Sequence, residues 1–166
     1  MKTKFFLAMG LLVIAGIVCG QNESRQNIET EQETKVKNTI DSGHFQMVMA
    51  FAQPMGMKYT FRLNFEYSLA LQGDSAIANL PYYGISYSIP LANNEDGIKF
   101  SEPVKEKQMV FNEKKKRYTI KFNVRNSIDS YHFVVTIWLS GKASIYVSSS
   151  NRQPISFTGQ LDLPEE

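Results

Sequence analysis

The clearest pattern along this chain is a strict alternation of apolar and polar residues. In the segment from Phe61 to Leu71 every second residue is apolar, and the positions between them include Arg62, Asn64 and Glu66. A period of two predicts a half-buried β-strand whose apolar face points to the core. The segment is longer than the usual strand of about 5–6 residues, so we expect a bulge or bend within it.

The rest of the chain continues this pattern. An alternating run from Phe45 to Phe51 ends at Pro54, and the Gly73-Asp74 turn leads into residues 75–80 as the hairpin partner of the long strand. Further strands are predicted at residues 98–101, 108–111, 118–124, 131–139, 143–147 and 155–161. About eight hairpin-connected strands without intervening helices indicate an all-β fold, either an antiparallel β-sandwich or a partly open barrel.

The start of the chain has a different pattern. Lys2 and Lys4 precede an apolar run from Phe5 to Val18, which ends at Cys19-Gly20. This order is typical of a secretory signal peptide, and the run is shorter than the membrane span of about 20 residues. Residues 1–20 are therefore predicted to be a leader, and the mature protein to be periplasmic or secreted.

Two ways of processing the leader remain open. Val18 and Gly20 suit a signal peptidase that cuts before Gln21, which releases a soluble protein. Alternatively Cys19 is lipidated, as in bacterial lipoproteins, although Val18 is a poor fit for the small residue expected before it. Acyl chains on Cys19 are the only membrane contact that we predict. Neither alternative leaves a free thiol, which excludes disulfides, thiolate catalysis and cysteine-bound metals.

Residues 21–40 form a polar spacer that contains a short helix. Val36 and Ile40 share one face of the helix predicted at residues 30–40, and Gly43 is placed to end it. Such a segment fits a tether to a membrane and equally an ordinary frayed N-terminus. The single β domain is then predicted to span residues 41–163.

Charge restricts the possible partners. Removal of the leader takes away Lys2 and Lys4, which leaves 16 basic and 16 acidic residues. A neutral domain has no electrostatic attraction to nucleic acid, so we expect no nucleic-acid binding.

The residues capable of chemistry are scattered. His44 and His132 are the two histidines, and they lack the paired spacing of a zinc site, so we predict no metal and no cofactor. A serine hydrolase triad would need Ser148, His132 and Asp129 to meet, and the Gly-x-Ser-x-Gly motif is missing. Glycoside cleavage would need two paired carboxylates. The candidates for that pair are Glu66, Asp74 and Asp162.

A group of tyrosines is the strongest candidate for a binding site. Tyr82, Tyr83 and Tyr87 surround Gly84 on an irregular segment, and flat amphipathic rings often line sugar and peptide sites. Arg152 follows a serine-rich loop and suits bidentate binding of a carboxylate. The alternative is structural: the rings plug one end of the fold, and Arg152 satisfies loop carbonyls and a buried acid.

Two segments also resemble a known family. Leu-Pro-Tyr-Tyr-Gly at residues 80–84, and the run from Ser148 to Gly159, are similar to the two signatures of domain of unknown function 4251. The similarity covers about residues 36–161. The family looks like exported envelope proteins of Bacteroidota, so the resemblance implies an envelope location. It implies no activity, cofactor or catalytic residue.

The resemblance adds one candidate modification. Asp74-Ser75-Ala76 resembles the Asp-Ser/Thr-apolar acceptor for O-glycosylation in that phylum, which would make Ser75 the glycosylated residue. The alternative is an ordinary turn with a small partner.

Together these patterns predict an exported, non-enzymatic cell-envelope protein. We interpret it as a binding or structural module for an envelope ligand or a protein partner. The alternative is a periplasmic hydrolase that acts on glycans or peptides, which predicts a cleft where His132 or two carboxylates converge. A scaffold protein would instead expose a contiguous apolar patch.

Overall fold

A computed structural model describes residues 30–64, 66–87, 97–127 and 129–164. These residues form one helix, at residues 30–41, and ten β-strands. The strands are β1 (His44–Pro54), β2 (Phe61–Arg62), β3 (Ser68–Gln72), β4 (Ser75–Pro81), β5 (Gly97–Pro103), β6 (Lys105–Asn112), β7 (Arg117–Arg125), β8 (Ser130–Trp138), β9 (Lys142–Ser149) and β10 (Ile155–Leu161).

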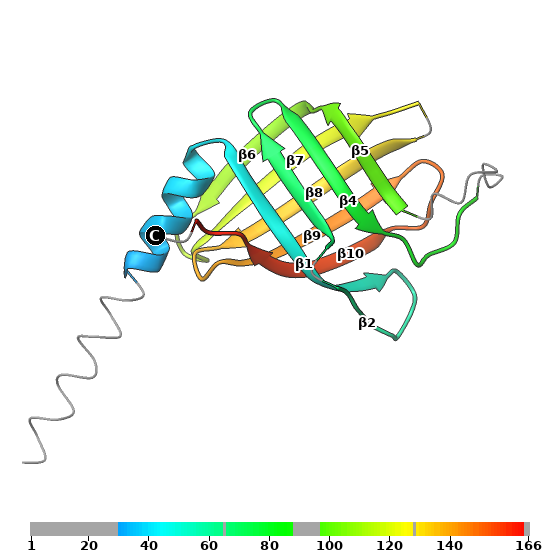
Figure 1. The fold of residues 1–166 in the computed structure, drawn as a ribbon, viewed down its shortest axis with the longest axis horizontal. Helices are drawn as coiled ribbons and strands as arrows, with labels where there is room; N and C mark the ends of the chain where they lie inside the picture. The colour runs from blue at the N-terminus through cyan, green and yellow to red at the C-terminus, as the bar shows by residue number, and fades with distance from the viewer. Residues whose placement is uncertain (1–29, 65, 88–96, 128, 165–166) are drawn as a thin grey trace, which may run out of the picture.

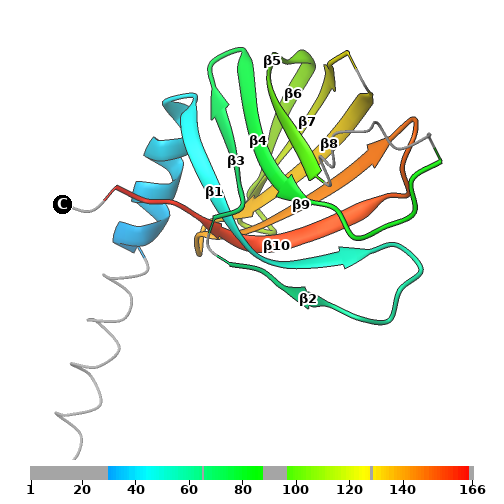
Figure 2. The same cartoon turned by 45° about the vertical axis from the view of Figure 1, so that its right-hand side comes forward.

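The strands form a single antiparallel sheet. Its order is β5-β4-β3-β1-β10-β9-β8-β7-β6, and β2 pairs with β1 outside this path. β1 pairs with β10 in the middle of this order, and the two edge strands, β5 and β6, are consecutive in the chain. The sheet curls into a nearly closed barrel, with a seam between β5 and β6 (Figures 1 and 2). The predicted all-β fold is confirmed, and of its two alternatives, a sandwich and a partly open barrel, the structure has the barrel.

The alternating pattern matches burial. In β7 and β8 every second side chain is buried, and Phe122 and Phe133 stack with their ring centroids 5.0 Å apart. Phe100 of β5 reaches across the barrel, where its ring centroid lies 5.7 Å from those of Tyr131 and Phe133. Aromatic side chains therefore fill this part of the interior as a core.

The segment predicted as one long strand is two strands. The expected bulge or bend is a full break between Arg62 and Ser68, which partly explains why the structure has more strands than the eight or so expected. The cause lies in β1, whose register with β10 shifts between Met49 and Phe51. Before this bulge β1 pairs with β3, and after it with β2.

The predicted N-terminal helix is confirmed, and it packs on the barrel. Val36 and Ile40 are fully buried in the core. The helix ends where expected, because the Gly43 N–H donates to the Ile40 carbonyl (3.0 Å) at a left-handed φ of 73°. Lys116 of the β6–β7 turn pairs with Glu33 at 2.6 Å, so the helix covers one end of the barrel (Figure 1).

The predicted leader and its Cys19 lie outside the described residues. Among the residues that are described, no helix is long and apolar enough to cross a membrane.

Candidate functional site

Three connections meet at the end of the barrel opposite the helix (Figures 1 and 2). They are residues 55–60 after β1, 82–87 after β4, and 150–154 between β9 and β10. Backbone hydrogen bonds join them: Met55 N–H to Pro154 O (2.9 Å), Gln153 N–H to Ile85 O (2.9 Å) and Tyr87 N–H to Asn151 O (2.8 Å). The connection from 150 to 154 thus holds the other two in place.

Tyr82 lies inside this junction. Its hydroxyl is 2.8 Å from the Ile85 carbonyl oxygen and 2.9 Å from that of Gln153, and its ring lies 5.1 Å from the Arg152 guanidinium. Burial raises the pKa of the Tyr82 phenol, and Arg152 offsets part of the rise. Gly84 leaves room for this contact, since a Cβ there would lie 2.5 Å from the Tyr82 hydroxyl oxygen.

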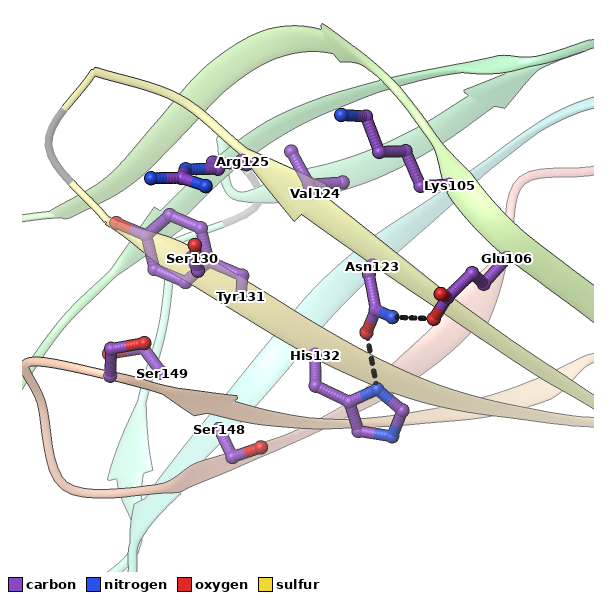
Figure 3. A pocket seen from close by; sticks show the side chains of 11 residues that line it. Lys105, Glu106, Asn123, Val124, Arg125, Ser130, Tyr131, His132, Ser148 and Ser149 are labelled. Carbon is purple, nitrogen blue, oxygen red and sulfur yellow. Dashed lines mark hydrogen bonds between the residues drawn. The ribbon is translucent and has the colours of Figure 1, made fainter.

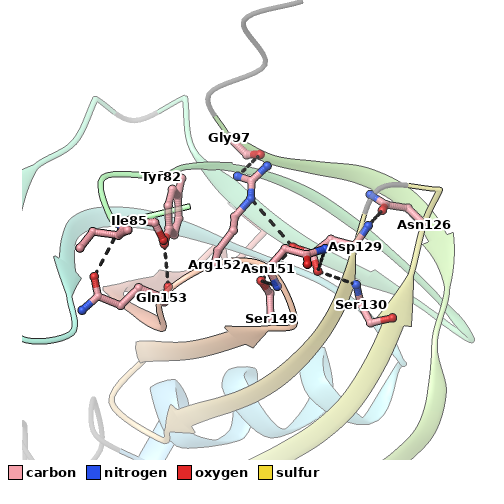
Figure 4. A network of polar contacts seen from close by, with 10 residues as sticks. All are labelled: Tyr82, Ile85, Gly97, Asn126, Asp129, Ser130, Ser149, Asn151, Arg152 and Gln153. Atoms are coloured by element: carbon pink, nitrogen blue, oxygen red, sulfur yellow. Dashed lines mark hydrogen bonds and ion pairs between the residues drawn. The ribbon is translucent and has the colours of Figure 1, made fainter. Parts of the chain in front are cut away.

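Arg152 is also engaged with protein groups. Its Nη1 donates to the Gly97 carbonyl at 3.0 Å, and its Nε lies 3.9 Å from the Asp129 carboxylate (Figure 4). The Arg152 side chain is 15% exposed and that of Asp129 only 1%. These contacts match the structural role considered for Arg152 in the sequence analysis, in which it satisfies loop carbonyls and a buried acid.

Asp129 is the centre of a polar network beneath the loops (Figure 4). It accepts hydrogen bonds from the Ser130 N–H (2.8 Å), the Ser149 hydroxyl (2.8 Å) and the Asn151 amide (3.3 Å). The Asp129 N–H itself donates to the Asn126 side chain at 2.8 Å. One buried carboxylate therefore ties the β7–β8 turn to the end of β9.

The first two of the three connections also expose large apolar side chains. We call them the aromatic loop surface, and their exposed fractions are Met55 54%, Tyr59 76%, Tyr83 37%, Ile85 56% and Tyr87 71%. Tyr83 stacks on Phe61 of β2, with ring centroids 4.5 Å apart, and its partial burial raises the pKa of its phenol. The structure thus separates the tyrosine group: Tyr82 is inside the junction, whereas Tyr83 and Tyr87 are on its surface.

Sequence reasoning missed Met55 and Tyr59. Both follow Pro54, which ends β1, in a segment interrupted by Gly56. The available clue was that large apolar residues follow Pro54 within a predicted turn. A turn rarely buries such side chains, so they are expected to be exposed.

A separate open pocket of about 470 Å³ lies on the outer side of the barrel (Figure 3). We call it the side pocket, and it is lined by Lys105, Glu106, Asn123, Val124, Arg125, Ser130, Tyr131, His132, Ser148, Ser149 and Ser150. These residues come from the start of β6, the end of β7, the start of β8 and the end of β9, and Ser150 directly follows β9.

A hydrogen-bond chain fixes the ring of His132 in this pocket. The Asn123 amide donates to Glu106 at 2.6 Å, which turns the Asn123 carbonyl oxygen toward His132 Nδ1, 2.7 Å away (Figure 3). A carbonyl oxygen only accepts, so Nδ1 carries a proton, and in the tautomer with that single proton Nε2 is an acceptor.

The hydrolase triple is not assembled. Ser148 is the cross-strand partner of His132, but His132 is bonded to Asn123 and Asp129 to Ser149 and its neighbours. His44 is bonded through Nδ1 to the Ser42 carbonyl at 3.0 Å, on the helix side of β1. Within the described ranges no group of three or more His, Cys, Asp or Glu could hold a metal ion.

The other candidates lie apart. Glu66 is between β2 and β3, Asp74 in the β3–β4 turn and Asp162 after β10, and all three are exposed. Ser75 is the half-buried first residue of β4, directly after that turn. Its modification stays a prediction.

Comparison with known proteins gives two findings. Residues 27–161 match the sequence profile of the family described as domain of unknown function, DUF4251. The crystal structure of a DUF4251 family protein from Bacteroides eggerthii DSM 20697 is similar with a TM-score of 0.62, at 10% identity, over 80% of this chain and 87% of that chain. At this identity the structural likeness shows the fold alone. No curated protein matches the chain.

Proposed function

The chain belongs to the DUF4251 family. From the geometry of its loops we propose that the protein is an exported, non-enzymatic binding module whose aromatic loop surface binds a carbohydrate chain. The observation that carries this proposal is the exposure of five large apolar side chains on loops that are pinned together. Exposed apolar groups of this kind mark interaction sites, and a rigid scaffold that positions loops is a usual place for them.

Tyrosine rings favour a carbohydrate as the ligand. Tyr59, Tyr83 and Tyr87 supply flat apolar faces with a polar hydroxyl at the edge. The C–H face of a pyranose ring packs on such a face while the sugar hydroxyls remain in water or bond to nearby polar groups. The Phe61 ring behind Tyr83 holds that tyrosine in one orientation, which lowers the entropy lost on binding.

The arrangement of polar groups favours binding over hydrolysis. A serine hydrolase needs its base bonded to the nucleophile and oriented by an acid. In this protein the carboxylate of the candidate triple bonds to Ser149 instead, and Asn123 orients His132. This placement supports a binding role more than the hydrolase alternative.

Mutation of the loop surface tests the proposal. We expect Tyr83→Ala combined with Tyr87→Ala to weaken binding by about tenfold or more, because two stacking faces are lost. Binding would be found on a microarray of neutral and acidic glycans and measured by calorimetry with the strongest binder. Val110→Ala is the control, since it shortens an exposed side chain on β6 outside the loop surface. A double variant that binds as tightly as the wild type contradicts the proposal.

Export is proposed from the leader pattern and is tested separately. We expect protein purified from native envelopes to have the intact mass of a chain that begins at Gln21 or of one acylated at Cys19. Uncleaved protein retained in the cytosol would contradict export and leave the binding proposal unaffected.

A further inference from the structure

We propose that the side pocket binds the carboxylate group of an acidic sugar, such as a hexuronate. The pocket offers cations on one side and uncharged hydrogen-bonding groups on the other. Neither Tyr83 nor Tyr87 lines it, so it is a second binding site beside the aromatic loop surface.

The cations of the pocket are Lys105 and Arg125. They come from the neighbouring strands β6 and β7, and Figure 3 shows both side chains at its upper rim. Among the described residues, neither has an acidic side chain within salt-bridge distance. An arginine guanidinium beside a lysine suits a carboxylate, because the planar fork donates two parallel hydrogen bonds.

The single carboxylate of the pocket, that of Glu106, is already hydrogen-bonded to Asn123. Glu106 lies in the β6 bulge between Lys105 and Gln108, with a left-handed φ of 55°. The bulge lets its carboxylate accept from Asn123 at 2.6 Å. Glu106 is thereby held by Asn123, and Lys105 and Arg125 remain available to an anionic ligand. A backbone in this strained region often marks a functional position.

The uncharged groups distinguish a sugar acid from a bare anion. Within the described part of the chain, the Ser130 and Ser148 hydroxyls make no hydrogen bond to other residues, and the Nδ1–H tautomer of His132 presents Nε2 as an acceptor. A bare anion needs only donors, whereas sugar hydroxyls need donors and acceptors together. The pocket supplies both beside its cations.

The choice of a sugar as carrier of the carboxylate rests on the proposed function. The side pocket and the aromatic loop surface share one segment of chain, because Ser149 and Ser150 line the pocket and the following residues, 151–154, hold the loops. From this shared segment we infer that one acidic glycan can contact both sites.

Nuclear magnetic resonance titration of the mature protein tests the inference. The probes are glucuronate, glucose and inorganic sulfate, and the backbone amides of Ser130, His132 and Ser148 report on the pocket. We expect saturable shifts there with glucuronate, and much weaker ones with glucose or sulfate. Arg125→Gln should weaken glucuronate binding by about tenfold. Lys115→Gln, which removes an exposed cation of the β6–β7 turn, should not change it.

The outcomes separate this inference from the proposed function. Pocket shifts that glucose matches, that sulfate matches, or that are absent with glucuronate each overturn the acidic-sugar site. An equal loss of affinity in Lys115→Gln overturns it too, since it would indicate a diffuse charge effect. If the pocket titrates as expected but the tyrosine double variant retains full glycan binding, the inference stands and the proposed function fails.

Discussion

Replacing Asp129 with alanine is expected to destabilise the protein by about 3 kcal/mol, because it removes one member of a buried charge pair and leaves several donors unsatisfied. The groups left without the carboxylate are the Arg152 guanidinium, the Ser149 hydroxyl and the Ser130 N–H. Urea unfolding followed by circular dichroism measures the change. The loops that Arg152 and Asn151 hold should also lose their order, so glycan binding should weaken with stability.

Two further variants give this prediction its control. Asp129→Asn keeps one of the two accepting oxygens, replaces the other with an NH2 group that cannot accept, and removes the charge, so we expect about half of the loss. Asp162→Ala removes an exposed carboxylate after β10 and should change stability by less than about 0.5 kcal/mol. If Asp129→Ala is as stable as Asp162→Ala, the network does not hold the loops.

The strands could be predicted from sequence because their signal is local. The alternation within β7, β8 and β9 predicts which side chains share the apolar face of each strand, and the structure buries that face. The break between β2 and β3 was outside the reach of that signal. The break depends on the bulge in β1 between Met49 and Phe51, which is part of the pairing of β1 with the distant strand β10.

The site was predictable only in part. Composition drew attention to Tyr82, Tyr83 and Tyr87, but it could not say that Tyr82 faces inward, because its hydroxyl partner Gln153 lies 71 residues away. The same limit hid the role of Asp129, whose hydrogen-bond partners Ser149 and Asn151 follow it by 20 and 22 residues along the chain. The His132 contact with Asn123 links neighbouring strands, and it required the β7–β8 register to be known.

Gly159→Ala is expected to be as damaging as Asp129→Ala or more so, although alanine is usually a mild replacement. Gly159 pairs with Met49 where β1 and β10 join, and a Cβ there would lie 2.0 Å from the Val48 carbonyl oxygen and 2.8 Å from the Met49 Cα. Both neighbours are backbone atoms, so no side-chain rotation relieves the clash. The strands must move apart, and we expect a loss of about 3 kcal/mol or failure to fold.

A second glycine shows whether space or backbone conformation causes this loss. Gly73 has a left-handed φ of 60°, and nothing lies within 4 Å of the position that a Cβ would take. Gly73→Ala should therefore cost about 1 kcal/mol from backbone strain alone. Urea unfolding of both variants compares them directly. A loss in Gly159→Ala no larger than in Gly73→Ala would mean that β1 and β10 can separate at little cost. The β1–β10 pairing would then contribute little to closing the barrel.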